Sequence, residues 1–236
     1  MTHEEILSNT AFFAETPVEA LTAIALSAKT QTLQRGDVLF NEGDKPDALF
    51  VVLSGRIAIA IGNKPLDSRE SMLALMEDGD LFGELGVLDN GPRSAMARAI
   101  ETSSVLRIPY EPVVTQMHAH PTMLWGVTKL LATRLRVMDE VLADSVFLDV
   151  TGRTAKRLLE LSGGSDDFVL PVTQEELAGM VGASRERVNK AIASFIRLGW
   201  LKQQDRRYHI IMRDRMTVRS SSFATPTSRA TSRACD

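Results

Sequence analysis

Residues 172–196 contain two short helical segments around a glycine, and this pattern constrains the fold more than any other feature of the chain. Thr173 and Glu176 have the spacing of a capping box, which predicts that a helix begins there. Gly182 predicts a sharp turn after that helix, because glycine readily adopts a positive φ. Ser184 then predicts the cap of a second helix.

The second predicted helix has one apolar and one polar face. Its apolar face carries Val188, Ile192 and Phe195. The opposite side, near the start of the helix, carries Arg185, Glu186 and Lys190. Two helices around a glycine turn, the second polar at its N-terminal end, are typical of a DNA-reading helix-turn-helix. The alternative is a helical hairpin with a charged, solvated face.

Two further features favour the DNA-reading interpretation. Residues 201–212 have the pattern of a β-hairpin with its turn at 204–207, which predicts a winged variant. From residue 151 onward the chain has 15 Lys and Arg against 9 Asp and Glu, a net charge of +6, whereas the first 150 residues carry −9. This asymmetry predicts a polyanionic partner for the C-terminal part alone.

A long helix is predicted over residues 121–146. Its stripe has heptad spacing and consists of Leu124, Thr128, Leu131, Leu135, Met138, Leu142 and Ser145. A helix that packs only on its own domain would explain the stripe, but its length and regularity favour a homodimer seam. Asp149 predicts the cap of a further helix over residues 150–161, followed by a loop at 163–167.

The first part of the chain has a different sequence pattern. A helix is predicted over residues 16–28, and short β-rich runs follow between Gly-containing turns at residues 35–37, 42–44 and 78–80. Short strands with such spacing predict a sandwich or barrel. The overall prediction is an α+β chain with an N-terminal jelly-roll-like β-roll.

Composition limits the remaining possibilities. No apolar run approaches the roughly 20 residues of a membrane helix, and we expect no secretory signal and a cytoplasmic location. The single Cys235 excludes a disulfide framework, and the four scattered histidines predict no metal site. Residues 217–236 are rich in Ser, Thr and Ala without apolar periodicity, so we expect a disordered tail.

A candidate ligand clamp lies within residues 82–99. Gly83 permits close backbone approach, and Glu84 can accept a hydrogen bond from a sugar hydroxyl. A turn at 90–92 delivers Arg93, whose planar fork suits a phosphate, and Ser94, a short hydrogen-bond donor. Together these residues could grip a ribose phosphate. The same Glu84 and Arg93 could form an acid–base pair, but a ligand clamp accounts for both, and we predict no enzymatic activity.

Three segments carry a resemblance to a known family. Phe82-Gly83-Glu84-Leu85 with Arg93-Ser94-Ala95 resembles the phosphate-binding cassette of cyclic-nucleotide-binding domains. Residues 148–153 and 181–186 resemble the hinge and recognition helix of the cyclic-AMP receptor protein family of bacterial transcription regulators. The resemblance extends over roughly residues 5–216, and residues 188–191 are similar to actinobacterial members.

The resemblance implies four parts. It implies a cyclic-nucleotide-binding β-roll over residues 1–120, a dimerisation helix over 121–147, a winged helix-turn-helix over 148–216 and the tail from 217. Each β-roll would bind one cyclic nucleotide, with cAMP expected. Cyclic di-GMP, no ligand at all, or action through protein partners instead of DNA are the alternatives.

The resemblance also implies residue roles. Glu84 would meet the ribose hydroxyl, and Arg93 and Ser94 would meet the cyclic phosphate. Gly83 and Leu85 would also belong to the nucleotide site. Met138 and Asp139 stand where cAMP-activated relatives have hydroxyl or amide side chains that meet the base, so this chain departs from the pattern there.

For DNA, the resemblance implies an inverted repeat similar to TGTGA-N6-TCACA and RNA polymerase as a partner. Arg185 would contact a guanine, Glu186 a cytosine amino group, and Lys190 a second guanine or a phosphate. The candidate phosphate contacts are Thr173, Gln174, Ser184, Arg206 and Arg207.

Overall fold

The structure is a computed structural model that describes residues 1–62 and 70–221. Met1–Asp139 form most of a first compact unit, and Glu140–Leu177 belong to a second. Helices and antiparallel sheets are both present, which confirms the predicted α+β class.

The first unit contains two antiparallel four-stranded sheets. Their strands are β1 (Lys29–Leu33), β2 (Val38–Phe40), β3 (Ala48–Ser54), β4 (Ile57–Gly62), β5 (Glu70–Met76), β6 (Leu81–Phe82), β7 (Met96–Ala99) and β8 (Ser103–Pro109). One sheet has the order β1-β8-β3-β6 and the other the order β2-β7-β4-β5. Gly36, Gly43 and Gly79 have positive φ in the turns between strands, as their Asp-flanked positions predict. This arrangement is the predicted β-roll.

Strand β3 is buried on both faces, which explains its unbroken apolar run. Phe50 and Val52 pack between the two sheets, in a core that also contains Phe82. Leu49 and Val51 point the other way, because successive side chains of a strand alternate, and they pack in the helix-covered core. The roll is therefore fixed between a sheet–sheet layer and a sheet–helix layer.

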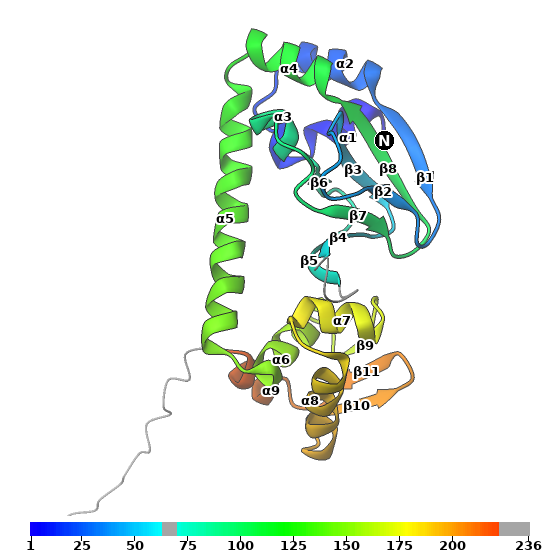
Figure 1. Ribbon diagram of the computed structural model, residues 1–236, viewed down its shortest axis with the longest axis vertical. Coiled ribbons are helices and arrows are strands. Elements are labelled where there is room, and N and C mark those ends of the chain that lie inside the picture. The colour runs from blue at the N-terminus through cyan, green and yellow to red at the C-terminus, as the bar shows by residue number, and fades with distance from the viewer. Residues whose placement is uncertain (63–69, 222–236) are drawn as a thin grey trace, which may run out of the picture. The chain divides into compact units, whose positions relative to one another are not determined.

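Helices cover the outer side of the β1-β8-β3-β6 sheet. They are α1 (His3–Ser8), the short 3-10 turn η1 (Ala11–Phe13), α2 (Val18–Ser27) and α4 (Tyr110–Ala119), while α3 (Leu85–Asp89) follows β6. Figure 1 shows α2 and α4 side by side, and the long α5 (Met123–Phe147) beginning next to them. Met123 and Val127 anchor the start of α5 in the helix-covered core.

Beyond its first turns, α5 keeps large apolar side chains on its surface. Leu135, Met138 and Leu142 are each more than 60% exposed. These are three members of the predicted heptad stripe. Within residues 1–62 and 70–221 nothing covers that part of the stripe, although burial of such a face would be expected to stabilise the helix.

The predicted winged helix-turn-helix belongs to the second unit except for Ala178–Gly182. Its elements are α6 (Val150–Leu161), β9 (Asp167–Val169), α7 (Gln174–Val181), α8 (Arg185–Arg197), β10 (Leu201–Gln204), β11 (Arg207–Ile210) and α9 (Arg213–Ser220). The hairpin of β10 and β11 is joined by β9 in a three-stranded antiparallel sheet of order β10-β11-β9. Asp149 caps α6 by accepting a hydrogen bond from the Gly152 amide at 2.8 Å, as predicted.

Two predictions for this unit need correction. The disordered tail was expected from Thr217, but Thr217–Ser220 complete α9, because Met216 is fully buried and anchors that helix. The rest of the predicted tail, residues 222–236, lies outside the described residues. Ser184 occupies the N-cap of α8, but its side chain makes no capping hydrogen bond.

Candidate functional site

A small pocket opens on the β-roll beside α5. Its apolar wall includes Phe40, Ile59 and Met76 from the β2-β7-β4-β5 sheet. Its polar lining is formed by Glu84, Arg93, Ser94 and Arg134.

Glu84 is buried at the junction between β6 and α3. Its side chain is only 1% exposed, and its Oε1 is paired with Nη1 of Arg134 from α5. Nη2 of the same arginine donates to the Leu81 carbonyl at 2.5 Å. Arg134 therefore connects α5 to both ends of the short β6 segment.

Arg93 is held by backbone carbonyls and an aromatic ring. Its Nη1 donates to the Gly83 carbonyl at 2.9 Å, and its Nη2 donates to the Ala48 carbonyl at 2.6 Å. The guanidinium carbon lies 4.1 Å from the centroid of the Phe40 ring. Burial lowers the pKa of Arg93, against the opposing effect of nearby Tyr110.

Gly83 is required for this arrangement. Its φ is +78°, and a Cβ there would lie 2.7 Å from Nη1 of Arg93. The Tyr110 hydroxyl contacts both groups: it donates to the Gly83 carbonyl and accepts from Arg93 Nη1 at 3.1 Å. Burial raises the pKa of Tyr110, so its hydroxyl stays protonated at neutral pH.

Two polar atoms of this pocket are buried without a hydrogen-bond partner. They are Oε2 of Glu84 and Nε of Arg93, two of the four such side-chain atoms among the described residues. An unpaired buried polar atom typically costs about 1–3 kcal/mol, and more when it is charged. An unused acceptor and an unused cationic donor at one pocket suit a ligand that carries both a hydroxyl and an anionic group.

The structure brings together five of the seven residues predicted for the nucleotide. Gly83, Glu84, Leu85, Arg93 and Ser94 all line the pocket. The other two, Met138 and Asp139, lie on exposed positions of α5 and do not line it.

Sequence reasoning missed Arg134. It lies one helical turn before Met138 on α5, and that spacing is the only local signal it has.

The helix-turn-helix has the predicted local geometry. Thr173 Oγ1 accepts from the Glu176 amide at 3.1 Å, and the Glu176 carboxylate accepts from the Thr173 amide at 2.7 Å, which completes the capping box. Gly182 has a φ of +66° in the turn. The buried face of α8 contains Val188, Ala191, Ile192 and Phe195.

The opposite face of α8 presents the predicted reading residues to solvent. Arg185, Glu186 and Lys190 are all exposed. Nζ of Lys190 lies 2.7 Å from Oε1 of Glu186, one turn earlier in the helix. The hydrogen bond from Lys190 lowers the pKa of Glu186, which keeps this carboxylate ionised and able to accept.

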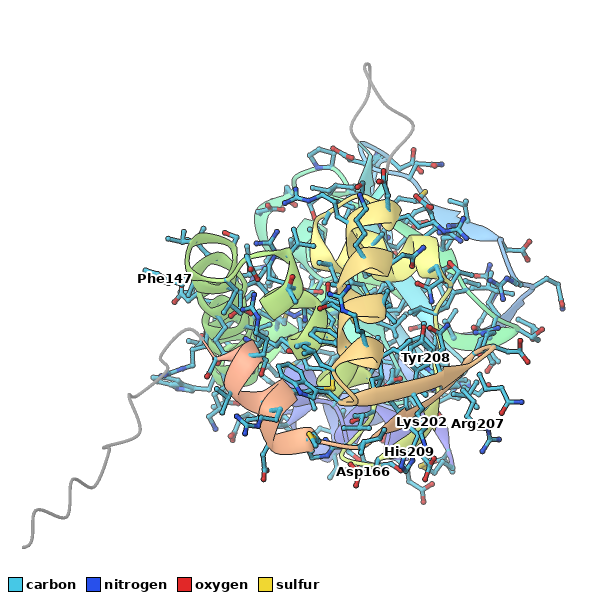
Figure 2. All side chains as sticks on the ribbon, turned by 90° about the horizontal axis from the view of Figure 1, so that it is seen from below. Phe147, Asp166, Lys202, Arg207, Tyr208 and His209 are labelled. Carbon is cyan, nitrogen blue, oxygen red and sulfur yellow. The ribbon has the colours of Figure 1, made fainter. Side chains whose placement is uncertain are left out.

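The remaining predicted DNA contacts on and near the wing fall into two groups, those exposed to solvent and those with contacts inside the unit. Figure 2 shows Lys202, Arg207 and His209 on the β10–β11 hairpin, and Arg207 is exposed. Arg206, in contrast, donates from Nη2 to the Leu170 carbonyl at 2.9 Å, and Gln174 donates to the Tyr208 hydroxyl at 2.7 Å. Arg206 and Gln174 thus have structural contacts inside the unit.

Residues 1–62 and 70–221 contain neither a candidate membrane span nor a candidate metal cluster. No helix there has the length and apolar character required to cross a membrane. No cluster of three or more His, Cys, Asp or Glu side chains there could hold a metal ion.

Family models match both units. Residues 30–120 match the model of the cyclic nucleotide-binding domain, and residues 152–219 match the model of the Crp-like helix-turn-helix domain. A solved structure of the c-di-GMP responsive global regulator CLP from Xanthomonas campestris has a similar fold, with a TM-score of 0.71 and 23% identity, covering 82% of this chain and 99% of that one.

Similar curated proteins agree with these matches. The CRP-like cAMP-activated global transcriptional regulator of Mycobacterium tuberculosis is 34% identical over 224 residues, which cover 92% of this chain and 99% of the relative. The cAMP-activated global transcriptional regulator CRP of Salmonella typhimurium is 33% identical over 161 residues, 65% of this chain and 76% of the relative. The chain therefore belongs to the CRP family, and it is a cyclic-nucleotide-responsive transcription regulator with a DNA-binding helix-turn-helix.

Proposed function

We propose that this chain is a homodimeric regulator whose affinity for an inverted repeat changes when cAMP binds its β-roll. Residues 1–120 bind the nucleotide, residues 121–147 dimerise and residues 148–216 read DNA. The similarity to a CRP-like cAMP-activated regulator over 92% of the chain supports this division of labour. The observation that carries the proposal is the pair of unused polar atoms, Glu84 Oε2 and Arg93 Nε, at one pocket.

The chemistry of this pair fits a cyclic nucleotide. A ribose hydroxyl can donate to the free carboxylate oxygen of Glu84, and a phosphate oxygen can accept from Nε of Arg93. Ser94 is exposed at the pocket and offers a second donor to the phosphate. The apolar wall that includes Phe40 and Ile59 suits a flat base better than a second charged group.

The identity of the nucleotide depends on α5. Met138 cannot donate or accept the usual base hydrogen bonds, whereas Asp139 could accept one from an adenine amino group. We favour cAMP over cyclic di-GMP on this chemistry and on the named relatives. The likeness to the c-di-GMP responsive regulator concerns the fold alone, at 23% identity.

Titration calorimetry with cAMP, cGMP and cyclic di-GMP tests the pocket. Loss of a buried charge-assisted contact costs about 2–5 kcal/mol, so Arg93→Ala should weaken binding of the preferred nucleotide roughly 30-fold or more. Arg35→Ala removes an exposed arginine from the same unit and is the matched control. Equal affinity in wild type and Arg93→Ala would refute the clamp, and tightest binding of cyclic di-GMP would replace cAMP as the effector.

The exposed stripe on α5 supports the proposed dimer. Leu131 is 37% exposed, and Leu135, Met138 and Leu142 are exposed further, which is unfavourable for one chain in water. A heptad stripe is typically buried by packing against the same stripe of a second copy of the chain. A two-fold dimer would also present two copies of α8 to the two halves of an inverted repeat.

For the DNA target we propose a repeat similar to TGTGA-N6-TCACA. Arg185 is exposed and could make a bidentate contact with guanine. Glu186 and Lys190 would exchange their mutual pairing at 2.7 Å for a cytosine amino group and for a second guanine or a phosphate, respectively. Thr173, Ser184 and Arg207 would contact phosphates, with Gln174 and Arg206 in supporting positions.

We further propose a non-enzymatic role, in the cytoplasm, with RNA polymerase as a partner at promoters. The alternative is a nucleotide-binding module that acts only through proteins. The exposed polar face of α8 speaks against that alternative. Absence of DNA binding in a gel-shift assay would favour it.

A further inference from the structure

The junction between α5 and α6 is contacted from the far end of the described chain. Helix α9 packs against α6, and its Met216 is completely buried. Figure 1 also shows α9 next to α6. Arg219, in the last turn of α9, reaches Asp149, the residue that caps α6.

The contact between Arg219 and Asp149 is bidentate on the carboxylate. Nη2 of Arg219 lies 2.5 Å from each carboxylate oxygen of Asp149. The same Oδ1 accepts from the Gly152 amide at 2.8 Å. One carboxylate therefore holds the first turn of α6 and the last turn of α9 together.

The backbone at Gly152 is adapted to this contact independently of charge. A Cβ at Gly152 would lie 3.0 Å from the carbonyl oxygen of Arg219 and 3.1 Å from its Nη1. Any larger residue would push the end of α9 away from the start of α6. Glycine at position 152 therefore leaves the space that Arg219 occupies at the end of α9.

A second ion pair lies on the other side of the junction. Asp144, near the end of α5, is only 8% exposed, and it lies 2.5 Å from Nζ of Lys156 on α6. Arg153 donates from Nη1 to the Leu148 carbonyl at 2.7 Å. Between Phe147, where α5 ends, and Asp149, the N-cap of α6, lies Leu148 alone, and its amide donates to the Asp144 carbonyl of α5 at 3.0 Å.

We propose that Arg219 is a positioning residue for DNA binding. By holding Asp149, it makes Asp149 a fixed part of the DNA-reading unit. The pivot between α5 and α6 is then confined to Leu148. A short pivot restricts the directions in which the unit can leave α5. In a dimer on an inverted repeat, this restriction sets which separation of half-sites both copies of α8 can reach together. The inference rests on the proposed dimeric reading of DNA and adds a determinant of half-site spacing to it.

The test compares binding of the full chain to two operators by fluorescence anisotropy. One operator has the six-base-pair spacer and the other has eight, which displaces one half-site by about 7 Å at about 3.4 Å per base pair. Wild type should prefer the six-base-pair spacer. Arg219→Gln should reduce that preference by about two- to fivefold, the range that an exposed ion pair can contribute.

Matched variants separate positioning from general damage. Arg215→Gln removes an exposed arginine of α9 and should keep the wild-type spacing preference, and Arg219→Lys should restore most of it. An unchanged preference in Arg219→Gln, or an equal loss of affinity on both operators, would overturn the proposal. If Arg219→Gln does not fold, Asp149→Asn removes the charge from the other side of the pair and must show the same reduction.

A second measurement tests the contact between Arg219 and Asp149 without DNA. Hydrogen exchange of the full chain should show the Gly152 amide exchanging about two- to fivefold faster in Arg219→Gln than in wild type or Arg215→Gln. No change there would overturn the proposal even if the spacing preference shifted. If wild type showed no preference for inverted repeats, the proposed function would fail, and the exchange measurement would still decide whether Arg219 holds the junction.

Discussion

Replacing Arg134 by methionine should destabilise the β-roll through the loss of one ion pair. Methionine keeps the length of the side chain but removes the one hydrogen-bond partner that the Glu84 carboxylate, which is 1% exposed, has among the described residues. The Leu81 carbonyl loses its donor at 2.5 Å as well. Removing one partner of a buried pair costs about 3–5 kcal/mol.

The expected magnitude is below that range. About a third of the Arg134 side chain is exposed, at 32%, so water can partly replace the lost guanidinium. We therefore expect about 2–3 kcal/mol of destabilisation. At about 2–4 °C per kcal/mol for a unit of this size, the melting temperature should fall by about 5–10 °C.

Thermal unfolding by differential scanning calorimetry measures the effect, and α5 provides its control. Lys129→Met breaks the pair of Lys129 with Glu15, whose side chains are 64% and 43% exposed, and should change stability by less than about 0.5 kcal/mol. Glu84→Gln in the Arg134→Met background should recover part of the loss, because the unpaired charge is then gone. Equal effects of Arg134→Met and Lys129→Met, or no recovery in the double variant, would refute the reasoning.

Three further predictions concern the long helix, the DNA surface and the junction. Leu135→Glu should give monomers in sedimentation, since a charge in the seam is costly, while Thr133→Glu on the other side of α5 should remain dimeric. Arg185→Ala should cost about 1–3 kcal/mol on the operator and little on random DNA, whereas Arg207→Ala should weaken both and lower the salt slope by about one. Partial burial favours a higher pKa for Asp149, but the Gly152 amide and Arg219 outweigh it and lower that pKa. Its stabilising effect is therefore present at neutral pH and lost below about pH 4, so the unfolding curves of wild type and Asp149→Asn should converge there.

Much of the fold could be predicted because local signals agreed with the tertiary structure. The capping box at Thr173, the turn at Gly182 and the cap at Asp149 are signals within one or two helical turns. The glycine turns and the apolar run of β3 likewise reflect local geometry and burial on both faces.

The missed strands have no such local signal. β1 (Lys29–Leu33) is polar at four of five positions and lies at a sheet edge, where its pairing with β8 decides its conformation. β9 (Asp167–Val169) is a three-residue edge strand that pairs with β11 about forty residues later. In both cases the strand is specified by a partner distant in the sequence.

The residues of the candidate site likewise divide into those with a local sequence signal and those without one. Glu84, Arg93 and Ser94 could be identified from a short segment, because the turn that delivers them is local. Arg134 could not, because it gains importance only through Glu84, fifty residues earlier. The carbonyls that hold Arg93 were also unpredictable, since Ala48 lies 45 residues from it.

The central claim is that a nucleotide in the β-roll changes how the chain binds DNA. The most direct measurement is the affinity of the full-length protein for the TGTGA-N6-TCACA operator, with and without saturating cAMP, at one fixed salt concentration. A coupling free energy of about 1–3 kcal/mol predicts that cAMP tightens binding roughly 5- to 150-fold, and that Arg93→Ala abolishes the change. An operator affinity that is the same with and without cAMP would contradict the account.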